Sequence, residues 1–388
     1  RAEEGPDGRN TLAPPARPPG MDERVREHAD VLVDWSARIE RGDHVVVRVA
    51  EGAHDLAVAV AEQLGERGAT IATIYAADEL SRAYLRGHDG DFETPEHELA
   101  LYEHADAVLS LGGGRNTFAT ADVDGATRQA SAKAVDPVRE ARLATDWVST
   151  VHPTRSLAQQ AGMSYEAYQD FVYDAVLRDW KALAEEMQQL KTVLDAGSEV
   201  RLVSDDTDLS MSIEGRTAVN SAASVAYDSH NLPSGEVFTA PYATEGTVHF
   251  DVPMTVSGSR LRGVTLRFKN GAVVDHAADV GEETLTDILE TDDGARRLGE
   301  LGIGMNRGID RVTDNILFDE KLGDTVHLAV GRAYDACVPE GESGNDSAVH
   351  VDLITDVSDD SRLEVDGETI QRNGRFRWEA GFDAASSP

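Results

Sequence analysis

The hydrophobic pattern of this chain changes near Gly197, and this change limits the fold more than any other feature of the sequence. Before Gly197, short apolar runs such as residues 44–50 alternate with segments of helical period such as residues 55–64. Strands that alternate with helices are typical of parallel β/α units. We therefore predict an N-terminal domain built on a parallel sheet.

Two helices and an extension frame this domain. Apolar residues at helical spacing predict a first helix over residues 22–39 and a long amphipathic helix over residues 170–194, which we expect to bridge two domains. Residues 1–20 are rich in Pro, Gly and charge and have no apolar period, so we expect a disordered extension there. The predicted N-terminal domain then covers residues 21–195.

After Gly197, apolar and polar residues alternate with a period of two, which indicates short strands. A helical pattern returns over residues 282–298. The predicted fold class is therefore α/β, with the N-terminal parallel β/α domain followed by a β-rich α+β domain over residues 196–388. The strands predicted in this second domain are residues 199–203, 208–213, 248–252, 261–268 and 272–276.

The charge of the chain excludes several classes of partner. Lys and Arg together number 36 and Asp and Glu 71, which gives a formal net charge of −35. An acid excess of this size disfavours nucleic-acid backbones and anionic membranes. We recognise no apolar run long enough to span a bilayer and no secretory leader, and the single Cys337 cannot form an internal disulfide. We expect a cytoplasmic protein with no nucleic-acid or membrane partner.

The positive charge is carried almost entirely by arginine, since the chain has only five lysines. An acidic, lysine-poor composition of this kind is typical of haloarchaeal proteins. At molar salt the Debye length falls to about 3 Å, so an acidic surface repels itself far less than it does in dilute buffer. We therefore predict a halophilic protein whose folding depends on salt.

A glycine-rich loop, GGGRN at residues 112–116, follows a predicted strand over residues 105–111. A loop of this kind can cradle a phosphate with its backbone amides. Neither GxGxxG nor GxxxxGK[ST] is present, however, and these are the patterns typical of nucleotide loops. A plain turn is the favoured interpretation, and nucleotide or anion binding from Gly112 to Arg115 is the alternative function.

Two strand-like runs in the C-terminal half carry imidazoles. In residues 325–331, His327 lies opposite the apolar side chains, and in residues 348–354 His350 and Asp352 share one face, because alternate residues of a strand point to the same side. A histidine in a strand is often a hydrogen-bonded core residue. The His-x-Asp spacing shifts the interpretation towards metal ligands.

Two glutamates occupy glycine-containing segments of the same half. Glu236 lies in NLPSGEVFTAP and Glu300 in GELGIGMN. Taken singly, each could be an ordinary surface carboxylate. Oxygen and nitrogen donors from separate strands and loops are nevertheless what a dinuclear hydrolytic site requires, because one short helix cannot surround two ions.

The segments NLPSGEVFTAP, RRLGELGIGMN, NILFDEKLGDTVHLAVGRAY and SAVHVDLI occur in this order. As a joint pattern, they resemble the thermophilic-type aminopeptidases of metallopeptidase family M29. The resemblance extends over most of the chain from Met21. It implies two divalent metal ions in the C-terminal domain, cleavage of amino acids one at a time from peptides with a free N terminus, and a homodimer with a partly enclosed active-site cavity.

The resemblance also implies roles for single residues. Glu300 would be the carboxylate that bridges the metals, and a carboxylate such as Glu236 or Glu300 would move the proton. Tyr334 matches a tyrosine beside the metals and could donate a hydrogen bond to the oxyanion.

Carboxylates with two imidazoles suit Zn²⁺, Co²⁺ or Mn²⁺. A relative that keeps metal but lacks activity is a further alternative. The implied metal ligands are Glu236, Glu300, Glu320, His327, His350 and Asp352.

Overall fold

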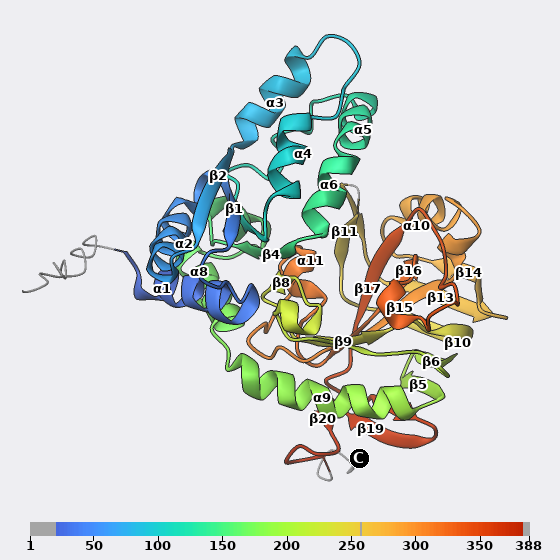
Figure 1. The fold of residues 1–388 in the computed structure, drawn as a ribbon. Helices are drawn as coiled ribbons and strands as arrows, with labels where there is room; N and C mark the ends of the chain where they lie inside the picture. The colour runs from blue at the N-terminus through green and yellow to red at the C-terminus, as the bar shows by residue number, and fades with distance from the viewer. Residues whose placement is uncertain (1–20, 257, 383–388) are drawn as a thin grey trace, which may run out of the picture.

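The computed structural model describes residues 21–256 and 258–382. The extension predicted for residues 1–20 lies outside the described residues. Figure 1 shows a β/α region, coloured blue to green, beside a β-rich region coloured yellow to red, with helix α9 (Trp180–Ala196) below them. The predicted fold class, an α/β fold with a parallel sheet followed by an antiparallel β-rich region, is confirmed.

The first region is built on a parallel sheet with the strand order β2-β1-β3-β4-β8. Helix α2 (His54–Arg67) connects β1 to β2 and ends at Gly68, whose φ of 76° suits glycine at a helix terminus. The strands are β1 (His44–Ala50), β2 (Thr70–Ala76), β3 (Ala107–Gly112), β4 (Asp146–Val151) and β8 (Asn231–Leu232).

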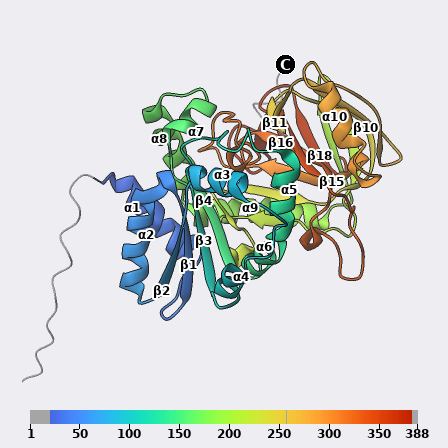
Figure 2. The ribbon, with the colours of Figure 1, turned by 90° about the horizontal axis from the view of Figure 1, so that it is seen from above.

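Helices cover both faces of this sheet, which Figure 2 shows from above. Val47 of β1 belongs to the main core together with residues of α2, whereas Val46 packs on the other face with Tyr102 and Val138. A strand buried on both faces reads as a continuous apolar run, as β1 does. The helices here are α1 (Glu23–Asp30), the π-helical turn Val31–Ser36, α3 (Asp78–Gly87), α4 (Glu96–Glu103), α5 (Gly125–Ala134), α6 (Asp136–Leu143) and α7 (Arg155–Gln160).

The single helix predicted over residues 170–194 is wrong. The segment forms two helices, α8 (Tyr165–Val176) and α9, with a break at residues 177–179. The Asp179 side chain accepts a hydrogen bond of 3.0 Å from the Ala182 amide and so caps a new helix. The apolar period continues across the break, which is why the pattern alone suggested one helix.

The second region contains two large antiparallel sheets that share one core, and a two-stranded antiparallel sheet of β11 (Met254–Val256) and β12 (Ser259–Leu261). The helix predicted over residues 282–298 is shorter, because α10 (Glu282–Leu289) ends early and Leu298 already starts a strand. One sheet has the order β14-β13-β10-β6-β5-β18-β19-β20, with bounds Ala272–Ala277, Val264–Lys269, Tyr242–Phe250, Thr207–Ser212, Glu199–Ser204, Arg362–Val365, Glu368–Arg372 and Arg375–Phe376. The other has the order β17-β16-β15-β9-β7, with bounds His350–Asp356, Thr325–Gly331, Leu298–Gly304, Glu236–Thr239 and Val219–Ser221.

The two regions meet where one segment passes from the parallel sheet to the antiparallel sheet β17-β16-β15-β9-β7. Strand β8 lies beyond the boundary predicted at residue 195, yet it pairs with β4. Glu236 begins β9 four residues after Leu232, where β8 ends. Gly235 between them has a φ of 112°, and a Cβ there would lie 2.8 Å from the Cβ of Asn306. This close crossing fixes where Glu236 enters the second sheet.

Candidate metal centre

One face of the antiparallel sheet β17-β16-β15-β9-β7 presents acids and imidazoles from four strands. Glu300 of β15 pairs with Ala329 of β16, and Ala329 pairs with Asp352 of β17. Paired residues of adjacent strands point to the same face, as do residues two apart. The side chains that this arrangement gathers on one face are Glu236, Glu300, His327, His350 and Asp352.

Small residues between these side chains leave room for them. Gly302 pairs with His327, and a Cβ at Gly302 would lie 2.0 Å from the His327 Nε2 atom. Any side chain at this position would therefore displace the imidazole. Ala329 lies between Glu300 and Asp352 in the next row and adds only a methyl group. The spacing of ligand-type residues thus depends on Gly302 and Ala329 as well as on the ligands.

The donor atoms form two groups that share Glu300. Glu236, Glu300 and His327 form one group, and Glu300, His350 and Asp352 form the other, with the donor atoms of each group within 4.8 Å of one another. Oε1 of Glu300 lies 3.2 Å from His327 Nε2, and Oε2 lies 3.2 Å from His350 Nε2. The two oxygens of a single carboxylate therefore face different imidazoles.

The orientation of these side chains and their unused hydrogen-bonding atoms are suited to bound cations. His350 Nδ1 lies 2.8 Å from the backbone carbonyl of Arg332, which accepts its hydrogen and leaves Nε2 directed at the carboxylates. Oε2 of Glu236 and Nδ1 of His327 are buried and have no hydrogen-bond partner among the described residues. A buried carboxylate oxygen without a partner is costly. A divalent cation at this position would compensate for it.

The pKa values of the cluster show how strongly it attracts positive charge. Burial disfavours the imidazolium of His350, but hydrogen bonds to Asp352 and Glu300 outweigh it and raise the pKa to about 11. Burial raises the pKa of Glu236 above its usual value. For Asp352, burial acts in the same direction, but contact with the histidines holds its pKa below the usual value. Without cations, protons on the imidazoles neutralise the acids.

Glu320 does not join either donor group. It follows the short helix α11 (Ile316–Asp319), lines the same pocket as Glu236 and Glu300, and its carboxylate contacts the ammonium group of Lys321. Lys321 is fully buried, and its Nζ lies 3.5 Å from Oε1 of Glu236. The sequence reasoning did not single out Lys321. The signal that could have identified Lys321 is its place beside Glu320 in the segment NILFDEKLGD, in a chain with only five lysines.

Tyr334 stands at the edge of the site. Its ring centroid lies 5.0 Å from that of His350 and 5.5 Å from that of Phe238. The side chain is half exposed, and among the described residues none forms a hydrogen bond with its hydroxyl. Burial and the neighbouring carboxylates hold the pKa of Tyr334 above its usual value. The phenol is therefore a protonated donor that faces the site.

A cavity of about 220 Å³ opens onto the cluster. Glu236, Glu300, Glu320 and Tyr334 line it from the second region. Trp147 and residues 228–231 line it from the side of the parallel sheet. Both regions of the chain therefore contribute to the space in which a substrate would lie.

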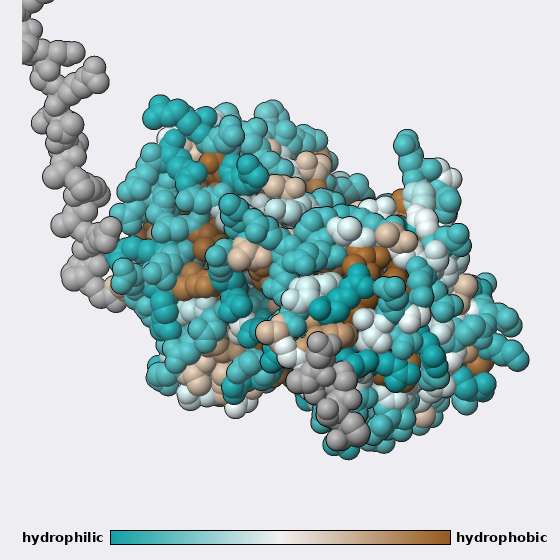
Figure 3. All heavy atoms as spheres, turned by 90° about the horizontal axis from the view of Figure 1, so that it is seen from below, coloured by the Kyte–Doolittle hydropathy of each residue, from teal (hydrophilic) through white to brown (hydrophobic). Residues whose placement is uncertain are grey.

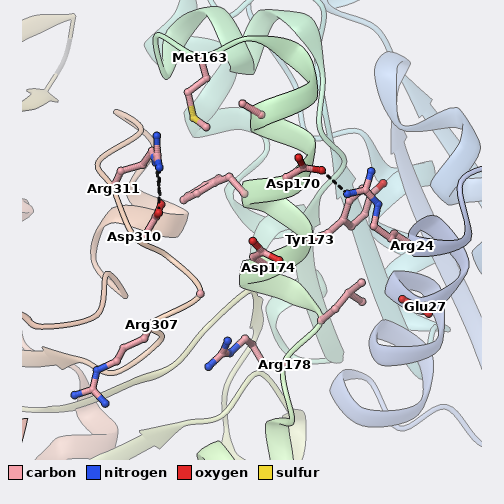
Figure 4. Close-up of a pocket in the computed structure, with 14 residues that line it drawn as sticks. Arg24, Glu27, Met163, Asp170, Tyr173, Asp174, Arg178, Arg307, Asp310 and Arg311 are labelled. Atoms are coloured by element: carbon pink, nitrogen blue, oxygen red, sulfur yellow. Dashed lines mark hydrogen bonds and ion pairs between the residues drawn. The ribbon is translucent and has the colours of Figure 1, made fainter.

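A larger cleft of about 540 Å³ lies elsewhere, between α1, α8 and the loop at residues 307–311. Figure 4 shows two of its arginines paired with aspartates of the same cleft: Arg24 donates to Asp170 at 2.7 Å, and Arg311 donates to Asp310 at 2.8 Å. Its lining contains no histidine. Neither of the two groups of candidate metal donors lies in this cleft, so the smaller cavity is the better candidate site.

The glycine loop after β3 is filled by the chain itself. Oδ2 of Asp78 accepts hydrogen bonds from the amides of Arg115 at 2.8 Å and Asn116 at 2.9 Å. A Cβ at Gly52 would lie 2.2 Å from the carbonyl oxygen of Gly113, so the ends of β1 and β3 pack closely. A carboxylate of the protein occupies the amides that a phosphate would need. This geometry disfavours the alternative of nucleotide or anion binding.

Comparisons with known proteins agree with the geometry. The family model described as thermophilic metalloprotease (M29) matches residues 21–376. The chain is 28% identical to "Aminopeptidase T" of Thermus thermophilus, over 90% of this chain and 97% of that protein. It is 38% identical to "Aminopeptidase 2" of Geobacillus stearothermophilus over only 38% of this chain and 40% of that protein.

A solved structure extends the likeness to the fold. The structure of wild-type AmpT from Thermus thermophilus superposes with a TM-score of 0.81 at 26% identity, covering 91% of this chain and 99% of that chain. The motifs in the sequence, the face of clustered donors and the family match over residues 21–376 lead to the same conclusion. The chain belongs to the M29 family of metalloproteases.

Proposed function

We propose that this metallo-aminopeptidase releases N-terminal amino acids from peptides with the help of two divalent cations. Glu236, Glu300 and His327 would hold one cation, and Glu300, His350 and Asp352 the other. The observation that carries the proposal is the position of Glu300, whose two oxygens each lie 3.2 Å from a different imidazole. The names of the aminopeptidases that this chain resembles support the choice of substrate.

The residues around the cavity would divide the chemistry among them. A bound pair of cations would lower the pKa of a shared water towards neutrality and polarise the scissile carbonyl. Tyr334 donates a hydrogen bond to the oxyanion, because its hydroxyl has no partner among the described residues. Glu236 and Glu300 contribute as ligands.

We assign proton transfer to the leaving amine to Glu320, which lines the cavity outside both donor groups. A carboxylate bound to metal is a weak base, so a carboxylate outside the donor groups is the better candidate. The alternative role for Glu320 is that of the sixth metal ligand, which the family resemblance implies. If Glu320→Gln keeps its metal but loses most of its turnover, the assignment holds; if Glu320→Gln loses metal, Glu320 is a ligand after all.

The test of the metal centre is metal analysis combined with activity. Protein purified in molar salt without chelator should carry about two transition-metal ions per chain, of Zn²⁺, Co²⁺ or Mn²⁺. Glu300→Ala and His350→Ala should each lose metal and fail to release amino acids from a short peptide. The same peptide with an acetylated N terminus is the control substrate. Full activity in either variant would contradict the assignment.

The same metal analysis addresses the two alternatives. A nucleotide-binding protein would carry no transition metal, and a metal-retaining but inactive relative would carry metal without releasing any amino acid from a panel of amino-acid amides. The Glu320 carboxylate and the Tyr334 hydroxyl, which line the cavity beside the two donor groups, favour an active enzyme.

We further propose a halophilic, cytoplasmic homodimer. The net charge of −35 supports a salt requirement, and the face seen in Figure 3 is largely covered by hydrophilic side chains. Cys337 is a free, buried thiol, which suits a reducing compartment. Among the described helices, none combines the length and the apolar character needed to cross a membrane. Circular dichroism in molar and in dilute KCl tests the salt requirement, and light scattering in molar KCl tests the dimer.

A further inference from the structure

We infer that Phe238, Tyr334 and Trp147 form the subsite for the side chain of the substrate's N-terminal residue, and that this subsite selects large apolar side chains such as those of leucine and phenylalanine. The inference rests on the proposed function, because it requires that the substrate's scissile bond lie beside Glu236 and Glu300. It adds which residues are accepted at the N terminus of the substrate. It also assigns one wall of the site to Trp147, in the parallel-sheet region of the protein.

Strand alternation gives the cavity a polar end and an apolar end. Glu236 and Phe238 are two residues apart in β9 and so point to the same face. On the neighbouring strand β7, Ser221 pairs with Glu236 and Val219 pairs with Phe238. At about 3.4 Å per residue, the apolar pair lies about 7 Å along the strands from the polar pair. That distance suits the reach of a leucine or phenylalanine side chain from the reacting carbonyl.

Aromatic rings on either side complete the apolar end. The Tyr334 ring lies 5.5 Å from the Phe238 ring at an angle of 55°. Trp147, at the start of β4, stacks on His230 at 4.4 Å and 10°, and Arg142 lies 5.5 Å from the Trp147 ring centroid. The Nδ1 atom of His230 also lies 2.8 Å from the Trp147 carbonyl oxygen. Trp147 is therefore held firmly as a wall.

The polar groups near this subsite are already satisfied within the protein. The Ser221 hydroxyl lies 3.0 Å from the Ser229 hydroxyl and 2.7 Å from that of Ser234. Asp228 lies 3.1 Å from His230 Nε2. The lining contains no lysine or arginine that would neutralise an acidic side chain of the substrate. An apolar side chain contacts the aromatic walls in such a site, whereas an acidic side chain would be desolvated without a cationic partner.

The size of the cavity sets a second limit. Its volume of about 220 Å³ is below the roughly 300–1,000 Å³ of pockets that enclose a whole drug-sized ligand. The cavity therefore accommodates one side chain and the adjacent backbone rather than a folded segment. Substrates with a small N-terminal residue, such as glycine or alanine, would not contact the aromatic walls, so they should be cleaved less efficiently.

The test measures kcat/KM for a series of amino-acid amides, which have no second side chain and so report on this subsite alone. Wild-type enzyme should prefer leucine and phenylalanine amides over alanine and glutamate amides. In Phe238→Ala, the ratio of kcat/KM for leucine amide to that for alanine amide should fall about 10-fold or more, because apolar contacts are lost. Val274→Ala is the matched control, since Val274 is an exposed apolar residue of β14 and should leave the ratio unchanged.

A second variant fills the subsite instead of enlarging it. Ala336 lines the same cavity, and Ala336→Phe should reverse the preference in favour of alanine amide. An unchanged ratio in both variants at full metal content, or a wild-type preference for lysine or glutamate amides, would overturn the subsite while leaving the peptidase intact. If wild-type enzyme with bound metal released no amino acid from any amide, the proposed function itself would be overturned.

Discussion

Each half of the molecule contains a pair of histidines that are buried or, at His350, partly buried, and the two pairs behave in opposite ways. In the N-terminal region, His28 is fully buried with its Nε2 atom 2.7 Å from the Thr150 hydroxyl, and burial lowers its pKa to about 3. Burial also lowers the pKa of His152. In the C-terminal region, burial is just as deep at His327, yet the pKa of His327 is raised by Glu300 and Glu236.

The difference lies in the neighbours rather than in the burial. His28 lies against a hydroxyl and the ring of Tyr173, so its environment favours the neutral imidazole. His327 and His350 face carboxylates that were brought together on one sheet face. A buried histidine is therefore a core residue in one setting and part of a cation site in the other. The predictions below test this contrast.

The largest effect is expected from Gly302→Ala. The new methyl group would overlap His327 Nε2, so the ring must turn away from Glu236 and Glu300. We expect loss of bound metal and with it of nearly all activity, since even indirect changes at metal ligands cost roughly 10–100-fold. Gly65→Ala in α2 is the control, because a Cβ there meets nothing within 4 Å. Unchanged metal content in Gly302→Ala would remove His327 from the proposed ligands.

Tyr334→Phe should lower kcat about 100- to 1,000-fold while the metal stays bound, because one donor to the oxyanion is lost. Single-turnover kinetics together with metal analysis distinguish a lost donor from a lost ligand. If metal is released along with activity, Tyr334 is a ligand rather than a donor.

His28→Gln tests the other half of the comparison. The variant should keep full metal content and its KM, but it should lose about 1–3 kcal/mol of unfolding free energy because a buried hydrogen bond to Thr150 is disturbed. Denaturant unfolding in molar salt measures this loss. A drop in metal content would mean that the two histidine pairs are coupled, contrary to the comparison.

The pH dependence of stability should carry the signature of His28. Its pKa of about 3 in the folded protein lies below the value near 6.5 of an unfolded histidine, so the unfolded state binds more protons between these values. Its contribution is fully present above pH 6.5 and decreases as the pH falls. At pH 5 the loss should be about 2 kcal/mol relative to pH 8. The stability difference between wild type and His28→Gln should therefore narrow at pH 5; a constant difference would contradict a neutral buried His28.

Local patterns in the sequence predicted much of the fold. The apolar runs predicted β1 and β16, and the His-x-Asp spacing predicted that His350 and Asp352 share a face, because a strand fixes the direction of alternate side chains. The break before α9 was missed, since a capping aspartate interrupts a helix without interrupting its apolar period. The ligand assignments taken from the family resemblance stay predictions until metal is measured.

The sequence by itself determined the α/β fold class and indicated the family, because these depend on periodicity and on the order of short motifs, and it named the candidate donor side chains. Only the tertiary structure decided that Glu300 faces two imidazoles, that Gly302 makes room for His327, that Lys321 is buried beside Glu236 and that Trp147 reaches the same cavity. These relations join residues far apart in the chain. Strand pairing and close packing create them, and no local pattern records them.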